Sequence, residues 1–209
     1  MADQLYLNLW FPSFTEADML PRLASVLRQF PFSAAKPGVG YVAVHGVAFA
    51  EPLVFSQTFE YQADTEDALK LAADFLHSDY AYELEALWDL WVPDKLHGDP
   101  DADPDAELDQ IWILRPQPVR FLAHGTDFED GMYQEAGHIQ VDFGLDTPFL
   151  HEEFEFTPQI EERIKSNVQK LVAFVQAVEK NCGVTGRILW SESEENLAQK
   201  LIAKLQRVH

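Results

Sequence analysis

Two histidines that flank an acidic loop are the side chains of this chain best suited to bind a metal ion or to activate water. His124 and His138 stand on either side of a segment that contains Asp127 and Glu135. Imidazole nitrogens, one or two carboxylates and a position left open to water are the components of catalytic zinc and iron sites. These four residues therefore form a candidate site for a divalent transition metal.

The two histidines can meet only if the segments around them pair as an antiparallel hairpin. Pairing Phe121 with Val141 places six apolar side chains on one face, namely Val119, Phe121, Ala123, Ile139, Val141 and Phe143. A slip of one residue would move this apolar set to the opposite face, so the pattern sets the register. The other face then pairs Arg120 with Asp142, Leu122 with Gln140, and His124 with His138. Directly opposed residues have Cβ atoms about 4.5 to 5.5 Å apart.

Two other interpretations of the histidine pair stay open. In the first, the polar face of the hairpin is simply solvated. In the second, the histidines gain charge near the acidic loop as the pH falls. Two further candidates have structural interpretations: Cys182 follows a helix end, whose negative dipole disfavours a thiolate, and His45 lies within an apolar strand as a satisfied core histidine.

Length, composition and motif content indicate a globular protein without a common catalytic signature. The chain has 209 residues, 47% of them hydrophobic, and its single cysteine cannot form an internal disulfide. No signal-peptide pattern is visible, and no window approaches the roughly 20 apolar residues of a membrane helix. The GxSxG, P-loop, GxGxxG, HExxH and CxxC motifs are absent. We expect a cytoplasmic protein that does not enter membranes.

Acidic residues dominate the middle of the chain. The net charge is −20, and residues 51–162 contain 28 Asp and Glu against 4 Lys and Arg. The rest of the chain has 7 acidic and 11 basic residues. Nucleic-acid backbones select for Lys and Arg, so this balance argues against nucleic-acid binding and favours a basic partner. The alternative is that the acidic surface only keeps the protein soluble.

The first 92 residues predict a ferredoxin-like half. Residues 38–61 read as two strands joined by a turn at residues 50–52, and alternation predicts further strands over 5–11 and 80–92. Residues 80–92 also fit a helical stripe, but their aromatic content favours the strand. With helices over residues 15–29 and from residue 65, the order is βαββαβ, that of a ferredoxin-like two-layer sandwich.

The rest of the chain predicts an acidic, proline-rich linker loop over 93–109 and a second α+β half over 110–209. Its order is βββαβα, with strands on both sides of a break at Pro116–Pro118 and a long helix that starts after Thr157. The linker alternates carboxylates as a calcium loop does, but Pro104 stands where such a loop needs glycine. The fold class is therefore α+β, an antiparallel sheet with helices on one face, the two halves packed as one unit.

Two classes of function agree with these observations. The first is an acidic interaction module that engages a basic protein partner, as inhibitors and immunity proteins for cationic toxins do. The alternative is a metal-dependent enzyme or small-molecule-binding protein that uses the His124 and His138 hairpin. A homodimer formed through one of the apolar helical stripes is compatible with either class.

Overall fold

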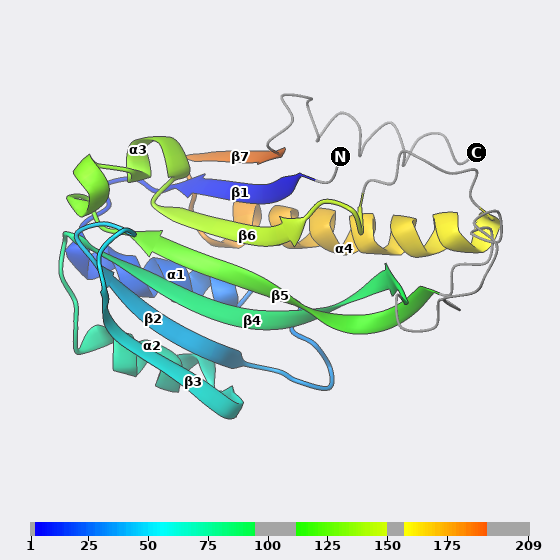
Figure 1. Cartoon of the computed structure of the whole chain (residues 1–209). Helices are drawn as coiled ribbons and strands as arrows, with labels where there is room; N and C mark the ends of the chain where they lie inside the picture. Colours follow the sequence, from blue (N-terminus) through cyan, green and yellow to red (C-terminus); the bar gives the residue numbers. More distant parts are fainter. Residues whose placement is uncertain (1–2, 95–111, 150–156, 192–209) are drawn as a thin grey trace.

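One antiparallel sheet of seven strands organises the part of the chain that the structure describes, residues 3–94, 112–149 and 157–191 (Figure 1). In this computed structural model the strand order is β3-β2-β4-β5-β6-β1-β7. The strands are β1 (Gln4–Trp10), β2 (Val39–Gly46), β3 (Leu53–Ala63), β4 (Tyr80–Pro93), β5 (Trp112–His124), β6 (Ile139–Leu145) and β7 (Gly186–Ser191). The helices are α1 (Met19–Leu27), α2 (Thr65–Ala73), α3 (Tyr133–Ala136) and α4 (Pro158–Asn181), with short 3-10 turns η1 (Glu16–Asp18) and η3 (Phe128–Asp130).

The antiparallel sheet and its helices confirm the general fold class, but the strand order differs from the one expected for the first half. β1 pairs with β6 and β7, and β4 pairs with β2 and β5. The four strands within residues 1–92 therefore do not form a ferredoxin-like sheet of their own. The hairpins β4–β5 and β5–β6 join strands that are neighbours in sequence, which leaves the outer edge of β6 for β1.

One hydrophobic core joins a face of the sheet to the helices. Alternate residues of the central strand β4 point into it, namely Tyr82, Leu84, Ala86, Trp88 and Leu90. α1, α2 and α4 contribute Leu23, Ala68 and Leu171 to the same core. Figure 1 draws these three helices behind the sheet, so the opposite face of the sheet is turned toward the viewer. We call that opposite face the outer face.

The sequence signals for the helices hold with small shifts of their ends. α4 begins at Pro158 after Thr157 and continues to Asn181, as its apolar spacing predicts. α2 begins after Asp64, whose carboxylate accepts a hydrogen bond from Glu66 N at 2.8 Å. α1 itself begins only at Met19, because the expected first turn at residues 16–18 is the 3-10 turn η1.

β4 and β5 pair from one end to the other. Residues 80–92 are confirmed as a strand, and β5 continues through Pro116 and Pro118, where the sequence predicts a break. The prolines lie opposite Asp89 and Leu87, and the Leu87 carbonyl accepts from Ser33 N on the side away from β5. Leu87 and Pro118 are therefore a pair without mutual hydrogen bonds, and Pro116 has the same parity. The missing amide protons cost no bond in this ladder.

The β5–β6 hairpin has the register that the apolar pattern predicts. Phe121 pairs with Val141 and Arg120 pairs with Asp142. The linker loop of 93–109, apart from residues 93 and 94, and the helix expected after Ser191 lie outside the described residues. Among the helices of the described ranges, none has the length and apolarity required to cross a membrane.

Four loops meet at one end of the sheet. β1 and β2 end there, β4 starts there and the β5–β6 connection turns there, as the strand register requires. These loops comprise residues 11–18, 47–52, 74–79 and 125–138. We call this region the loop end; it is the left end of the molecule in Figure 1.

Candidate binding site at the loop end

Backbone hydrogen bonds tie the loops of the loop end to one another. Val47 N donates to Asp79 O at 2.9 Å, Glu129 N donates to Val47 O at 2.8 Å, and Asp127 N donates to Ser78 O at 2.9 Å. Three loops that are distant in sequence are thereby held as one unit. Val47 is at the centre of this network with a φ of 63°, a left-handed conformation that a β-branched residue rarely adopts.

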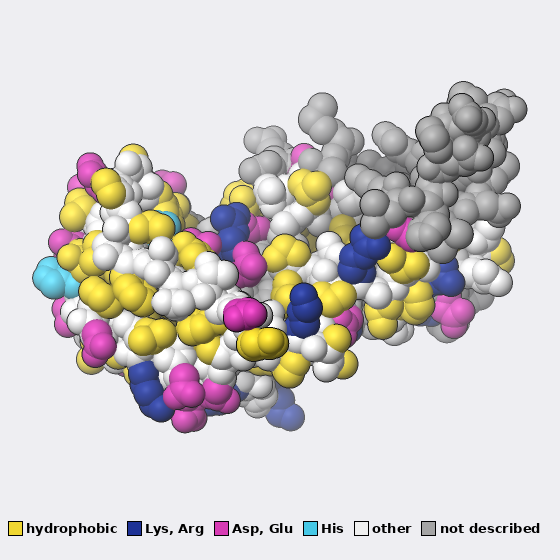
Figure 2. Space-filling model, turned by 60° about the horizontal axis from the view of Figure 1, so that its bottom comes forward, with side chains coloured by type: hydrophobic (Ala, Val, Ile, Leu, Met, Phe, Trp, Pro, Cys, Tyr) yellow, Lys and Arg dark blue, Asp and Glu magenta, His cyan; other side chains and the backbone are white. Residues whose placement is uncertain are grey.

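The loop end is acidic and contains no lysine or arginine. Its exposed carboxylates are those of Glu16, Glu51, Asp74, Asp127, Glu129, Asp130 and Glu135. The left margin of Figure 2 shows this character, since Asp and Glu side chains and one histidine appear there while Lys and Arg lie further to the right. Two apolar side chains stand among the carboxylates: Val47 is 56% exposed and Phe49 is 36% exposed.

His124 is buried beneath these loops with one ring nitrogen unpaired. Its exposed fraction is 0%. Nδ1 lies 2.8 Å from Gly137 O, and a carbonyl can only accept, so the Nδ1 hydrogen is donated to it. Burial lowers the pKa of His124, and the neutral ring then carries a bare lone pair on Nε2. Nε2 is buried and has no hydrogen-bond partner among the described residues.

His45 on β2 likewise has a hydrogen-bond partner for only one of its two ring nitrogens. Its Nε2 lies 2.8 Å from Glu83 Oε2 on the adjacent strand β4. In the neutral ring this nitrogen must donate, because a carboxylate only accepts, and Nδ1 is then the bare acceptor. Nδ1 is buried and without a partner among the described residues. His45 and His124 both lie opposite Ala81 in the sheet, so the two imidazoles share one row of the outer face.

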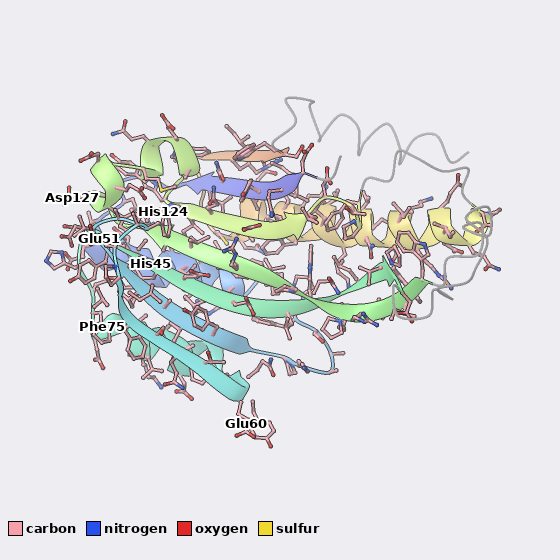
Figure 3. The ribbon with its side chains drawn as sticks, in the orientation of Figure 1. His45, Glu51, Glu60, Phe75, His124 and Asp127 are labelled. Atoms are coloured by element: carbon pink, nitrogen blue, oxygen red, sulfur yellow. The ribbon has the colours of Figure 1, made fainter. Side chains whose placement is uncertain are left out.

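The ring of Phe49 packs against both histidines. Its centroid lies 4.8 Å from that of His45 and 6.1 Å from that of His124, with the ring planes nearly perpendicular. Phe128, which is fully buried, is 5.0 Å from Phe49 and stacks on His124 at 6.2 Å. Figure 3 places His45 and His124 together at the loop end with Glu51 and Asp127. With His45 in its neutral form, the site combines two bare ring nitrogens, a carboxylate and two aromatic rings.

The structure places His138 next to His124 but gives it a different environment. His124 N donates to His138 O at 2.9 Å, and the Nδ1 of His138 accepts from Phe11 N at 2.9 Å. The His138 ring stacks between Phe14 at 4.2 Å and Tyr133 at 4.9 Å. Burial lowers the pKa of His138, as it does for His124. Nδ1 of each ring is thus already used. Because Nδ1 of His138 accepts, the neutral His138 ring carries its hydrogen on Nε2, so of these two rings only His124 has a bare Nε2.

The two acidic members of the sequence-predicted site are directed to other partners or to solvent. Asp127 Oδ2 accepts from Ser78 Oγ at 2.7 Å, and the Glu135 side chain is exposed. No group of three or more His, Cys, Asp or Glu side chains in the described ranges is placed to hold a metal ion. Cys182 is buried, its thiol donates to Ser25 O at 3.3 Å, and burial raises its pKa, all of which suits a structural cysteine.

Sequence reasoning missed His45, Glu83 and Phe49 as partners of His124. His45 was expected to be a satisfied core histidine, and the structure satisfies only one of its nitrogens. The alternation in β2 and β4 does place His45 and Glu83 on the face opposite to the core. The missing information was the pairing of β2 with β4, which brings that face beside His124.

Comparison with known proteins finds no matching family model, no matching curated protein and no matching solved structure.

Proposed function

We propose that this protein is an interaction module whose loop end docks a basic segment of a partner protein, in the manner of an inhibitor or immunity protein. The observation that carries the proposal is the composition of four loops that are joined at one end of the sheet. They present exposed carboxylates around Val47 and Phe49 and contain no Lys or Arg. Acidic groups around an apolar centre match a partner that carries Lys and Arg around apolar anchors.

A partner of opposite charge is attracted over a distance and then held by apolar contact. Long-range attraction accelerates association and weakens as salt screens it. The strain at Val47 supports the same reading, because a sparsely populated backbone conformation persists only where its surroundings over-determine it and is found at functional sites. A cytoplasmic location belongs to this proposal as well.

The test uses a fluorescent lysine- and arginine-rich peptide with apolar residues, and a glutamate-rich peptide as the reverse control. Binding is measured by anisotropy from about 0.05 M to about 0.5 M salt, over which the screening length shortens severalfold. We expect binding of the basic peptide alone, with an affinity that falls as salt rises. Equal binding of both peptides, or none of the basic peptide at low salt, contradicts the proposal.

Two triple variants locate the surface. The first neutralises the loop end with Glu51→Gln, Asp130→Asn and Glu135→Gln. The second removes the same charge elsewhere with Glu60→Gln, Glu161→Gln and Glu162→Gln, all exposed residues outside the four loops; Figure 3 shows Glu60 far from the loop end. We expect the first variant to weaken binding about tenfold and the second to change it less than about twofold. Equal losses would mean that only net charge matters.

A metal-dependent function at His124 and His138 is a second candidate, and one observation favours it. Metal-ligating histidines usually donate their other ring hydrogen to a carbonyl or carboxylate, as His124 does to Gly137. The test is a thermal-shift series with zinc, manganese, iron(II) and nickel after chelator treatment, on wild type and on the His124→Ala, His138→Ala double variant. A shift that the variant loses supports the metal site. Absence of any shift removes this candidate.

A further inference from the structure

We propose that the loop end binds the side-chain cation of a lysine or arginine, at the position that the Phe49 ring fills between His45 and His124. The inference rests on the proposed function, because it names the group that a basic partner would insert. It adds the buried contact that gives specificity, which a surface of exposed carboxylates alone does not supply. In the unbound protein the Phe49 ring occupies this site as a plug, and the incoming lysine or arginine side chain displaces it.

The polar atoms around Phe49 are acceptors. His124 donates its Nδ1 hydrogen to Gly137 O and keeps a lone pair on Nε2. When its ring is neutral, His45 donates its Nε2 hydrogen to Glu83 and keeps a lone pair on Nδ1. An ammonium or guanidinium group has donors and no acceptors, so it complements two bare nitrogens and a carboxylate. A carboxylate or phosphate ligand would find acceptors facing its own acceptors. The chemistry therefore selects a cation with N–H groups.

The unpaired nitrogens indicate that this site is incomplete without a ligand. A buried acceptor without a partner destabilises the folded state, and native proteins keep few of them. Here two occur in one row of the sheet, on histidine rings that both pack beside the ring of Phe49. The second ring, that of Phe128, has its centroid 5.0 Å from that of Phe49, within the distance over which an aromatic ring attracts a cation.

Phe49 is able to leave without disrupting the loop. The backbone bonds described for the turn at residues 46–51 involve Gly46, Val47, Ala48 and Glu51, and not Phe49. Rotation of the Phe49 side chain breaks none of these bonds. The ring is already 36% exposed, so moving it into solvent uncovers less apolar surface than releasing a core phenylalanine would.

The experiment measures binding of n-butylguanidinium and n-butylammonium, with n-butanol as the neutral control of similar length. Protein labelled with nitrogen-15 in its histidine rings reports directly, because a bare ring nitrogen that accepts a hydrogen bond changes its chemical shift. We expect both cations, and not the alcohol, to shift the signals of His45 Nδ1 and His124 Nε2 saturably. The signals are assigned with single-histidine variants.

Two variants with a matched control make the test specific. Phe49→Ala removes the plug and should tighten cation binding about tenfold, since the fraction of open sites rises. Phe55→Ala is the control, because Phe55 lies in β3 beyond the same turn and stacks on Phe75 at 5.0 Å instead. His124→Phe keeps an aromatic ring but removes the acceptor, and should abolish the effect on His45. Amide spectra of each variant confirm that it is folded.

Several outcomes would overturn the inference. These are the absence of a saturable shift in both wild type and Phe49→Ala, an equal response to n-butanol, or the same tightening in Phe55→Ala. Failure of the proposed function has a different signature. If the basic peptide binds wild type and His124→Phe equally, docking on the carboxylates stands and the cation site fails. If the small cations bind but no basic peptide does, the cation site stands and the docking proposal fails.

Discussion

Asn167 of α4 and His124 of β5 are both buried polar side chains, but they differ in how many of their polar atoms have hydrogen-bond partners. Asn167 is 1% exposed and makes three hydrogen bonds. Its Oδ1 accepts from Trp91 N at 2.9 Å, and its Nδ2 donates to Trp91 O at 2.8 Å and to Pro148 O at 2.9 Å. His124 is equally buried but leaves one of its two ring nitrogens without a partner.

The difference separates a structural polar group from a candidate binding group. β4 pairs with β2 only as far as Ala86, so the backbone beyond that residue lacks a neighbouring strand on this side. Asn167 supplies the missing partner for Trp91, and Lys170 does the same for the carbonyl of Asp89. A helix thus takes the place of a strand for these backbone groups of Trp91 and Asp89. At the loop end, by contrast, the buried Nε2 of His124 has no hydrogen-bond partner among the described residues.

The largest expected effect is on stability, from Asn167→Ala. The substitution leaves the Trp91 amide, the Trp91 carbonyl and the Pro148 carbonyl without their partner in a partly buried position. We expect the free energy of unfolding to fall by about 3 kcal/mol. Urea denaturation measures the change, with Gln169→Ala at an exposed position of the same helix as the control. A loss no larger than that of the control would refute the structural role of Asn167.

A smaller effect is expected from His124→Phe, although the residue is at least as buried. The substitution removes the bare Nε2, which favours the folded state, and leaves Gly137 O without its donor, which opposes it. These terms are of similar size, so we expect a change of about 1 kcal/mol or less in the free energy of unfolding. The same urea experiment measures it. A loss as large as that of Asn167→Ala would indicate that His124 is a structural residue and would break the comparison.

The local part of the candidate site could be predicted from the sequence, and its long-range part could not. The β5–β6 register follows from an alternating apolar pattern in two neighbouring segments, and Phe121 and Val141 do pair. The same pattern brought His124 to His138, its nearest partner along the hairpin. His45 is distant in sequence and reaches the row of His124 only through the pairing of β2 with β4.

The order of the strands in the sheet could not be predicted from the sequence for a related reason. β1 is apolar on one face and could have joined several edges, since nothing in its own residues distinguishes β6 and β7 from other neighbours. The prolines of β5 were also ambiguous. Pro116 and Pro118 interrupt a strand when their nitrogens face a paired neighbour and are harmless when they face away, as here. The side to which a proline nitrogen points, and the strand that lies on that side, are known only once the sheet is assembled.

The smallest expected effect is a difference in pH dependence between wild type and His124→Phe. Burial lowers the pKa of His124 in the folded state below the unfolded value of about 6.5. At pH values between the folded and unfolded pKa, His124 therefore binds a proton in the unfolded chain but not in the folded protein. The stability that the neutral ring contributes is complete above about pH 6.5 and is lost as the pH falls through that value toward the folded pKa.

His124→Phe has no proton to bind at this position in either state. Between about pH 7.5 and about pH 6, wild type should lose more stability than the variant, by up to about 0.8 kcal/mol, as judged by urea midpoints at each pH. His138, whose pKa burial also lowers, and Glu85 and Asp146, whose pKa values burial raises, are present in both proteins. The contributions of Glu85 and Asp146 cancel in the difference. That of His138 cancels in its larger part, because its pKa is lowered first by burial, which both proteins share, and second by the charge of His124, which the variant lacks. Parallel curves would mean that His124 accepts a proton in the folded state, which would fill its Nε2 and remove the lone pair on which the cation site depends.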